Sequence, residues 1–210
     1  MVKNKRTYSG DIVIVEGKTD KAFLECFTTK NITSIDGYYN LKPELQTITN
    51  QPKNLENINS LLVIVDADDD INIRKLDLIQ IFDDNGLKLP DNYQFGTKVS
   101  IKGITVGIFI MPDNSSNGSL ETLVLQSVKS TQLLPCIDGA IACRNQSTKP
   151  FNQNTTTNQI DKTKLGLYIS MLLADYEFNH RDIIDNEIDF NDTCFANLTY
   201  RNFNVKTATL

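Results

Sequence analysis

Tryptophan is absent from this 210-residue chain, and histidine occurs only once, at position 180. Chemistry that needs two imidazole groups is therefore excluded. His180 follows the end of an expected helix, where an imidazolium cation would oppose the negative end of the helix dipole. This position favours a structural role for His180 over a catalytic one.

Cysteine is scarce and scattered. No two of the four cysteines form a Cys-x-x-Cys pair, so the sequence contains neither a zinc knuckle nor a thiol redox motif. We expect reduced, partly buried thiols at all four positions. These cysteines are Cys26, Cys136, Cys143 and Cys194.

Long hydrophobic runs are also missing. The longest, Leu61 to Val65 and Ile104 to Met111, are well short of the roughly 20 apolar residues that span a bilayer. The basic N-terminus is followed by a short strand-like segment, with no secretory cleavage signal behind it. We therefore expect a cytoplasmic protein that does not cross a membrane.

Basic residues are outnumbered. The chain has 21 Lys and Arg against 26 Asp and Glu, which gives a formal net charge of -5. A protein that holds nucleic acid through bulk electrostatics is normally basic, so this balance argues against that class. Any phosphate-bearing partner must instead be bound locally or through a metal.

The residues that are present predict one ordinary globular α/β protein, with 40% hydrophobic and 22% charged residues. Short continuous apolar runs alternate with helical patterns, which is typical of a mainly parallel sheet covered by helices on both faces. The expected strands are 11–15, 61–65 and 104–111, and the expected helices are 19–29, 73–85 and 120–128.

Local signals refine two of these helices. The helix 73–85 is expected to pack through Leu76, Ile79 and Phe82, with Gly86 in the left-handed conformation just after it. Ser119 is the expected N-cap of the helix that starts at Leu120. The polar stretch 33–60 has room for a short edge strand and a small helix.

The second half of the chain divides by composition. We predict an α/β domain over 1–144, a polar mobile loop over 145–159, and a helical C-terminal extension over 160–210 that packs on the same core. The loop is rich in Asn, Gln and Thr. Within the extension, apolar residues at helical spacing predict a helix over 162–178, and a last amphipathic piece covers 194–203.

Acidic residues follow two of the expected strands. The first strand runs into Glu16-Gly17-Lys18-Thr19-Asp20, and the second into Asp66-Ala67-Asp68-Asp69-Asp70. Ligands of open parallel sheets bind outside the carboxyl ends of the strands, so acids at these positions indicate a site. Asp66 and Asp68 are two residues apart in extended chain and point to one side, and Glu16 joins them if the strands are neighbours.

This acid cluster has no cationic partner in the sequence, so its carboxylates should repel one another unless a cation binds. Oxygen ligands suit Mg²⁺ or Mn²⁺, which is the cofactor we expect. Neutralising Asp68 should accordingly stabilise the metal-free protein. Gly17 allows a sharp turn into the first helix, whose N-terminus offers amides to a phosphate, so we place Gly17, Lys18 and Asp20 at the substrate.

The two acidic motifs resemble those of the Toprim domain, the metal-binding module of topoisomerases, primases, small ribosomal-RNA maturases and overcoming-lysogenisation-defect (OLD) nucleases. The resemblance rests on VEGKTDKAFLE and, some fifty residues on, LLVIVDADDD, and it covers about residues 11–130. It implies a Rossmann-like sheet with Asp66 and Asp68 as metal ligands and Glu16 as a ligand or general acid/base. The motif pattern is most similar to OLD-type nucleases and small ribosomal-RNA maturases.

The resemblance extends less specifically to a third motif. In OLD-type nucleases a later glutamate helps to hold a second metal, and a late lysine steadies the transition state. These roles would fall on Glu121, in Gly118-Ser119-Leu120-Glu121, and on Lys164. An acid in the first turn of a helix and a lysine on a solvated face also have ordinary structural explanations.

The function implied is metal-dependent hydrolysis of phosphodiester bonds in DNA or RNA. The chain is too short for a topoisomerase and lacks the zinc ligands of a full primase. Two alternatives stay open: a regulatory module that binds a nucleotide or phosphate without turnover, and an effector that is active only with a partner protein. The oligomeric state is not predicted.

Overall fold

The structure is a computed structural model. It describes residues 8–25, 27–28, 30–128, 131–147, 150–151 and 155–173, and it omits the side chains of residues 52–54, 131, 172 and 173. His180, Cys26, Cys194 and the expected piece 194–203 lie outside the described residues.

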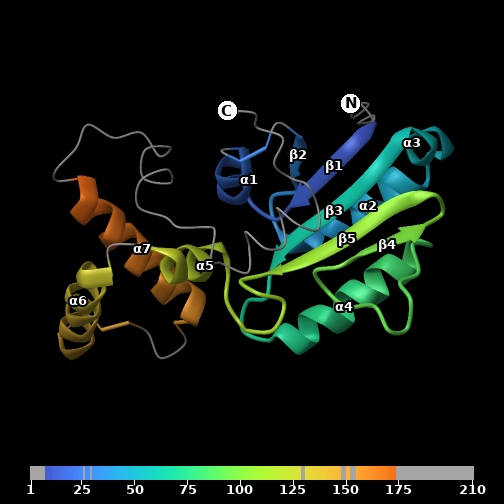
Figure 1. The fold of residues 1–210 in the computed structure, drawn as a ribbon. Helices are drawn as coiled ribbons and strands as arrows, with labels where there is room; N and C mark the ends of the chain where they lie inside the picture. The colour runs from blue at the N-terminus through green and yellow to red at the C-terminus, as the bar shows by residue number, and fades with distance from the viewer. Residues whose placement is uncertain are drawn as a thin grey trace, which may run out of the picture.

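The fold is built on a five-stranded, mostly parallel sheet (Figure 1). Its order is β2-β1-β3-β5-β4, and only β4 runs antiparallel to its neighbour. The predicted α/β class is confirmed. The strands are β1 Gly10–Val15, β2 Asn31–Ser34, β3 Ile58–Asp66, β4 Lys98–Ile101 and β5 Ile104–Met111.

Helices flank both faces of this sheet. They are α1 Lys18–Glu25, α2 Leu41–Thr49, α3 Pro52–Asn57, α4 Ile71–Asp84, α5 Leu120–Ser127, α6 Leu134–Gln146 and α7 Thr157–Leu173, with short 3-10 turns at Tyr38–Asn40 and Thr131–Leu133. None of the described helices is long and apolar enough to cross a membrane.

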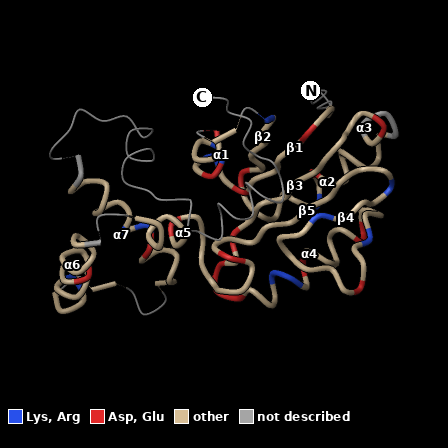
Figure 2. Tube along the Cα trace, in the orientation of Figure 1, with Lys and Arg blue, Asp and Glu red and all other residues tan. Residues whose placement is uncertain are grey.

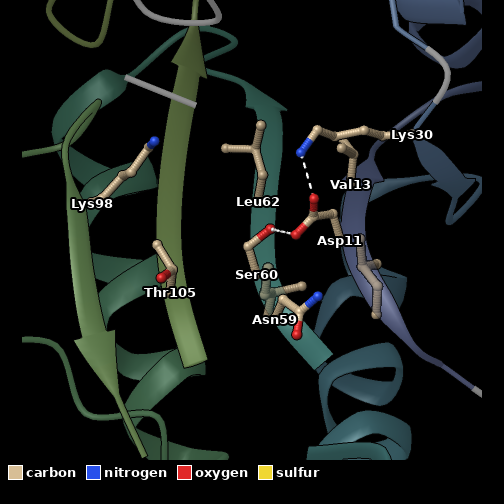
Figure 3. A pocket seen from close by; sticks show the side chains of 10 residues that line it. Asp11, Val13, Lys30, Asn59, Ser60, Leu62, Lys98 and Thr105 are labelled. Atoms are coloured by element: carbon tan, nitrogen blue, oxygen red, sulfur yellow. Dashed lines mark hydrogen bonds and ion pairs between the residues drawn. The ribbon is translucent and has the colours of Figure 1, made fainter. Parts of the chain in front are cut away.

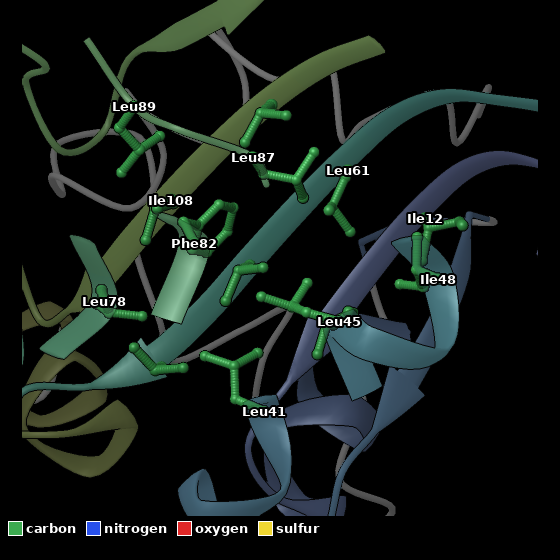
Figure 4. Packing of buried hydrophobic residues seen from close by; sticks show 14 of the residues in the cluster. Ile12, Leu41, Leu45, Ile48, Leu61, Leu78, Phe82, Leu87, Leu89 and Ile108 are labelled. Atoms are coloured by element: carbon green, nitrogen blue, oxygen red, sulfur yellow. The ribbon is translucent and has the colours of Figure 1, made fainter. Parts of the chain in front are cut away.

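The larger core lies between the sheet and the helices α2 and α4 (Figure 4). Alternate residues of β1, β3 and β5 point to this face, as the two-residue period of a strand requires. The helices contribute side chains that are fully buried. Those from α2 are Leu41, Leu45 and Ile48, and those from α4 are Leu78 and Phe82.

The other face of the sheet is covered by α1 and α5. Phe23 and Leu24 of α1 and Leu123 of α5 pack on the remaining strand residues. A third cluster, formed by Val128, Ile137 and Tyr168, joins α6 and α7 beyond the end of α5. The chain after β5 therefore builds a helical layer that reaches back to the sheet through α5.

The predicted inner face of α4 is wrong in part. Phe82 is buried, but Leu76 and Ile79 are 68% and 44% exposed. The helix begins at Ile71, and Ile71, Leu78 and Phe82 supply its buried face. Because α4 carries large apolar residues on two sides, the spacing alone could not identify the buried one.

The C-terminal end of α4 follows the expectation. Gly86 has a φ of 67°, and its amide donates to the carbonyl of Asp83, so the predicted left-handed residue is confirmed. The stretch 33–60 contains the end of the edge strand β2 and the small helices α2 and α3. The helix α6, which the sequence did not predict, and α7, which begins at Thr157, both overlap the expected loop 145–159.

Candidate metal centre

The carboxyl ends of β1, β3 and β5 meet at one edge of the sheet. Val15 pairs with Ile64, and Asp66 pairs with Met111, so Glu16, Asp66 and the loop after β5 emerge side by side. Acidic segments gather near these strand ends and near α1 and α5 (Figure 2). The topology thus places the two acidic motifs together, as the sequence predicted.

Asp66 lies at the centre of this group of acids. Desolvation raises its pKa well above the ordinary value. The backbone amide of Leu120, at the start of α5, donates to Asp66 Oδ1 at 3.1 Å. Four further carboxylates raise the pKa of Asp66 by repulsion: Asp20, Glu16, Glu121 and Asp68.

Glu16 follows β1 directly and is largely withdrawn from solvent. Its Oε2 atom is buried and has no hydrogen-bond partner among the described residues. Desolvation raises the pKa of Glu16 and the charge of Asp68 adds to this, whereas Arg74 and the amide of Asp66 act in the opposite direction. A buried carboxylate oxygen without a donor is an available ligand for a cation.

Asp20 is buried in the first turn of α1 and is hydrogen-bonded to the residue that precedes this helix. Its Oδ2 accepts a hydrogen bond from the Gly17 amide at 2.7 Å, and a Cβ at Gly17 would lie only 3.2 Å from the same atom. Desolvation raises the pKa of Asp20, Glu121 adds to it, and Lys162 opposes it. The Gly17 amide, which we expected to meet a phosphate, is thus already bonded within the protein.

Lys18 begins α1 at the surface. Its side chain is 82% exposed, and its Nζ lies 3.6 Å from Asp36 Oδ1. A surface pair of this kind contributes little to stability and leaves the ammonium group easy to move. Contact of Lys18 with a substrate stays a prediction.

Asp68 differs from Asp66 in having strong partners. Arg74 Nη2 donates to Asp68 Oδ2, and Asn158 Nδ2 donates to Asp68 Oδ1 at 2.7 Å. The expectation that the acid cluster has no cationic partner is therefore wrong. The sequence could not show this, because Arg74 becomes a neighbour only through the direction of α4, and Asn158 only through the packing of α7.

The backbone of Asp68 is fixed separately by the loop after β5. Asp68 has a φ of 54° and forms a β-bridge with Gly118. The Asp68 amide donates to the Gly118 carbonyl at an N to O distance of 2.9 Å, and the Gly118 amide donates to the Asp68 carbonyl at 3.0 Å. Gly118 has a φ of 140°, and a Cβ there would lie 2.7 Å from Thr122 Oγ1, so this position requires glycine. Asn117 ties the same two loops together through Asp69 and Ile71.

Glu121 reaches the acids from the first turn of α5. Ser119, the confirmed N-cap residue of α5, donates from Oγ to Glu121 Oε2 at 2.8 Å. Thr122 donates from Oγ1 to Asp161 Oδ2 at 2.6 Å, which fastens α7 to the start of α5. Glu121, from the third motif, thus lies near the acids of the first two motifs, and α7 lies beside the start of α5.

Lys164 is directed elsewhere in the structure. Its Nζ lies 2.7 Å from Asp138 Oδ1 of α6, whereas Lys162 is the lysine whose charge acts on Asp20. The two lysines are two residues apart, so they leave α7 in directions about 160° apart. The catalytic role of Lys164 stays a prediction. Sequence reasoning missed Arg74 and Asn158 as members of the site.

The donor atoms suit a hard divalent cation in their chemistry, because they are all carboxylate oxygens. Among the described residues, no three acidic, histidine or cysteine side chains form a set already arranged to hold an ion. Several of the oxygens accept hydrogen bonds from the protein itself. Among the oxygens of these acids, Glu16 Oε2 is buried and accepts no hydrogen bond from the described residues. Asp68 would have to break its ion pair with Arg74 to bind a cation together with Glu16.

A separate pocket of about 260 Å³ lies at the opposite end of the strands (Figure 3). Asp11 lies at its wall, where Lys30 Nζ and Ser60 Oγ each approach a carboxylate oxygen at 2.6 Å. Lys98 and Thr105 face it from the other side. The pocket shares no lining residue with the acid cluster, so it is not part of this site.

A comparison with models of protein families finds a match. The family model described as "Protein of unknown function (DUF3226)" matches residues 10–199. No curated protein and no solved structure matches the chain. The matched range runs from β1 through α7, so it includes all five acids of the cluster.

Proposed function

We propose that this chain, which belongs to the DUF3226 family of proteins of unknown function, hydrolyses phosphodiester bonds in nucleic acid with Mg²⁺ or Mn²⁺. The observation that carries the proposal is the convergence of five carboxylates at the carboxyl end of a parallel sheet. The resemblance to Toprim nucleases supports the same reaction. These carboxylates are Glu16, Asp20, Asp66, Asp68 and Glu121.

Asp66, Asp68 and Glu16 are the residues that would hold a metal ion, and Glu121 would help to hold a second one. Once bound, the metal supplies orientation of the phosphate, activation of water and neutralisation of charge on the leaving oxygen. The chain itself supplies the oxygens, of which those of Asp66 and Glu16 are desolvated and those of Asp68 are half-exposed. Asp66 is fixed by the Leu120 amide, and Asp68 by its bridge to Gly118.

Glu16 is suited to move a proton. Its pKa is raised by desolvation, so it takes up a proton at higher pH than an exposed glutamate does. A group of this kind can protonate a leaving oxygen or accept a proton from water. Glu16 Oε2 can equally serve as a metal ligand, and the two roles differ in their pH profiles.

Nucleic acid as the substrate, and a cytoplasmic setting, are parts of this proposal. A net charge of -5 means that the substrate is held locally at the site. A second candidate is a module that binds a nucleotide or phosphate without turnover, or that turns over only with a partner protein. The contacts of Asp68 with Arg74 and Asn158 favour it, because they occupy an oxygen set that catalysis needs.

The direct test is cleavage of labelled single-stranded, double-stranded and structured DNA and RNA by the purified protein. We expect cleavage with Mg²⁺ or Mn²⁺ and none in EDTA. Glu16→Gln should lower the rate by roughly a hundredfold, because it removes the titrating group and one ligand charge. Asp83→Asn, on the exposed side of α4, is the control and should keep the wild-type rate. Equal cleavage with and without EDTA would contradict the proposal.

The two lysines of α7 give a second prediction. Lys162→Ala should lower turnover by roughly tenfold, because it removes the charge that acts on Asp20 beside the metal ligands. Lys164→Ala should have a smaller effect, since Lys164 is paired with Asp138. Steady-state kinetics of the two variants, with circular dichroism to check folding, make the comparison. A larger loss in Lys164→Ala would restore the role that the family resemblance implies.

A further inference from the structure

Arg74 is an unusually well-placed cation within the acid cluster. Its side chain is only 11% exposed, and its guanidinium carbon lies 3.6 Å from the centre of the Tyr38 ring. From this position Arg74 bonds Asp68 and also opposes the raised pKa of Glu16. One guanidinium group therefore acts on two of the carboxylates that are expected to bind a metal.

The backbone of Asp68 is held by contacts other than those with Arg74. The backbone bridge to Gly118 fixes the Asp68 loop, and Asn158 supplies a second donor to the carboxylate. The Asp68 side chain is still 45% exposed, so its oxygens remain accessible to a ligand. Burying a guanidinium group costs free energy, and the structural gain from holding an already fixed, half-exposed acid is small.

We propose that Arg74 has two successive partners: Asp68 in the metal-free protein, and a phosphate oxygen of the substrate once Asp68 binds the metal. This inference rests on the proposed function, because it concerns the same site. The planar fork of guanidinium N-H donors matches phosphate as well as it matches a carboxylate. The Tyr38 ring can hold the guanidinium group in both arrangements, so only the end of the side chain has to turn.

The exchange predicts that Arg74 has opposite effects on the affinities for the metal and for phosphate. In the free protein Arg74 competes with the metal for Asp68, so Arg74 lowers metal affinity. In the loaded protein Arg74 contributes to phosphate binding, so it raises phosphate affinity. A residue that only stabilised the fold would not shift the two affinities in opposite directions, and for this reason the pair of measurements is diagnostic.

The experiment is isothermal titration calorimetry on the full chain, first with Mg²⁺ alone and then with inorganic phosphate in saturating Mg²⁺. Arg74→Gln should bind Mg²⁺ about tenfold more tightly and inorganic phosphate roughly ten- to hundredfold more weakly than wild type. Lys75→Gln removes the same charge from the next residue of α4, which faces Phe95, and should match wild type in both titrations. Arg74→Lys keeps the charge but loses the planar fork of N-H donors, so its phosphate affinity should lie between those of Arg74→Gln and wild type.

Wild-type phosphate affinity in Arg74→Gln, or Mg²⁺ binding that is unchanged or weaker, would overturn the exchange. If Arg74→Gln does not fold, the phosphate affinity of Arg74→Lys decides in the same way. The proposed function fails separately. If wild type cleaves no nucleic acid, but Arg74→Gln still binds Mg²⁺ more tightly and phosphate more weakly than wild type, hydrolysis is refuted and the exchange is kept. Conversely, wild type that cleaves, with an unchanged KM in Arg74→Gln, would keep hydrolysis and refute the exchange.

Discussion

Asp66→Asn is expected to abolish metal-dependent cleavage and, at the same time, to raise the melting temperature of the protein in EDTA. Loss of a central metal ligand removes several kcal/mol of transition-state stabilisation, which corresponds to at least about a thousandfold in rate. The gain in stability has a different origin. The Asp66 carboxylate is desolvated and surrounded by other carboxylates, so its charge destabilises the metal-free fold.

Asparagine retains what the fold needs at this position. Its Oδ1 can still accept from the Leu120 amide, and the substitution removes a charge that repels those of Glu16 and Asp20. We expect a gain of roughly 2 kcal/mol, or about 4–8 °C in melting temperature for a chain of this size. Differential scanning fluorimetry in EDTA and in millimolar Mg²⁺ measures it, and the variant should lose most of the Mg²⁺-induced rise that wild type shows.

Asp68→Asn is the matched control for this prediction. The sequence led us to expect that neutralising Asp68 would stabilise the metal-free protein, but Asp68 is paired with Arg74 and hydrogen-bonded by Asn158. Asparagine there leaves the partly buried guanidinium of Arg74 without its charge partner, so the melting temperature in EDTA should stay level or fall. A rise in Asp68→Asn with no rise in Asp66→Asn would show that repulsion is not centred on Asp66.

The three central strands β1, β3 and β5 were predictable because they are buried on both faces and so appear as continuous apolar runs. The short edge strands β2 and β4 are partly exposed, and β4 was not predicted. The observed bounds of β5, Ile104–Met111, match the predicted strand. The helix α6 was not predictable in this way. Only Ile137 and Ile141 are buried in it, and Pro135 near its start and Gly139 within it are typical of turns and breaks.

The acids of the site were predictable for a related reason. Glu16, Asp66 and Asp68 are placed by the ends of buried strands, and a pattern that identifies the strand also locates its end. Arg74 and Asn158 are placed instead by which side of α4 faces Tyr38 and by how α7 docks on α5. These are tertiary contacts between segments up to 90 residues apart, and no local pattern encodes them.

The resulting site holds its negative charge in two ways. The Asp68 charge is balanced by Arg74, whereas desolvation raises the pKa values of Asp66 and Glu16 and so disfavours their ionisation. A metal ion would compete with a proton at Asp66 and Glu16, and with a guanidinium group at Asp68. Binding of the ion should therefore release protons, and the stability of the empty site should depend on pH.

The metal-free protein is accordingly expected to be more stable near pH 5 than near pH 7.5. The folded-state pKa values of Asp66, Glu16 and Asp20 are raised, chiefly by desolvation, above those of the unfolded chain. Between the unfolded and folded values the folded protein binds more protons, so its free energy of unfolding falls as pH rises through this window. Each pKa unit between the folded and the unfolded state of a buried group changes the free energy of unfolding by about 1.4 kcal/mol.

Acids with lowered pKa values do not reverse this trend. Asp11, whose pKa is lowered chiefly by a hydrogen bond from Lys30, contributes stability that is present above the unfolded pKa and is lost only in more acidic solution. Melting temperatures in EDTA between about pH 5 and pH 8 should fall by several degrees in wild type and less steeply in Asp66→Asn. In millimolar Mg²⁺ the fall should shrink or reverse, because the ion binds the deprotonated acids. Equal slopes in EDTA for wild type and Asp66→Asn would mean that Asp66 is ionised without penalty in the folded protein, and the central argument for a cation at this site would fail.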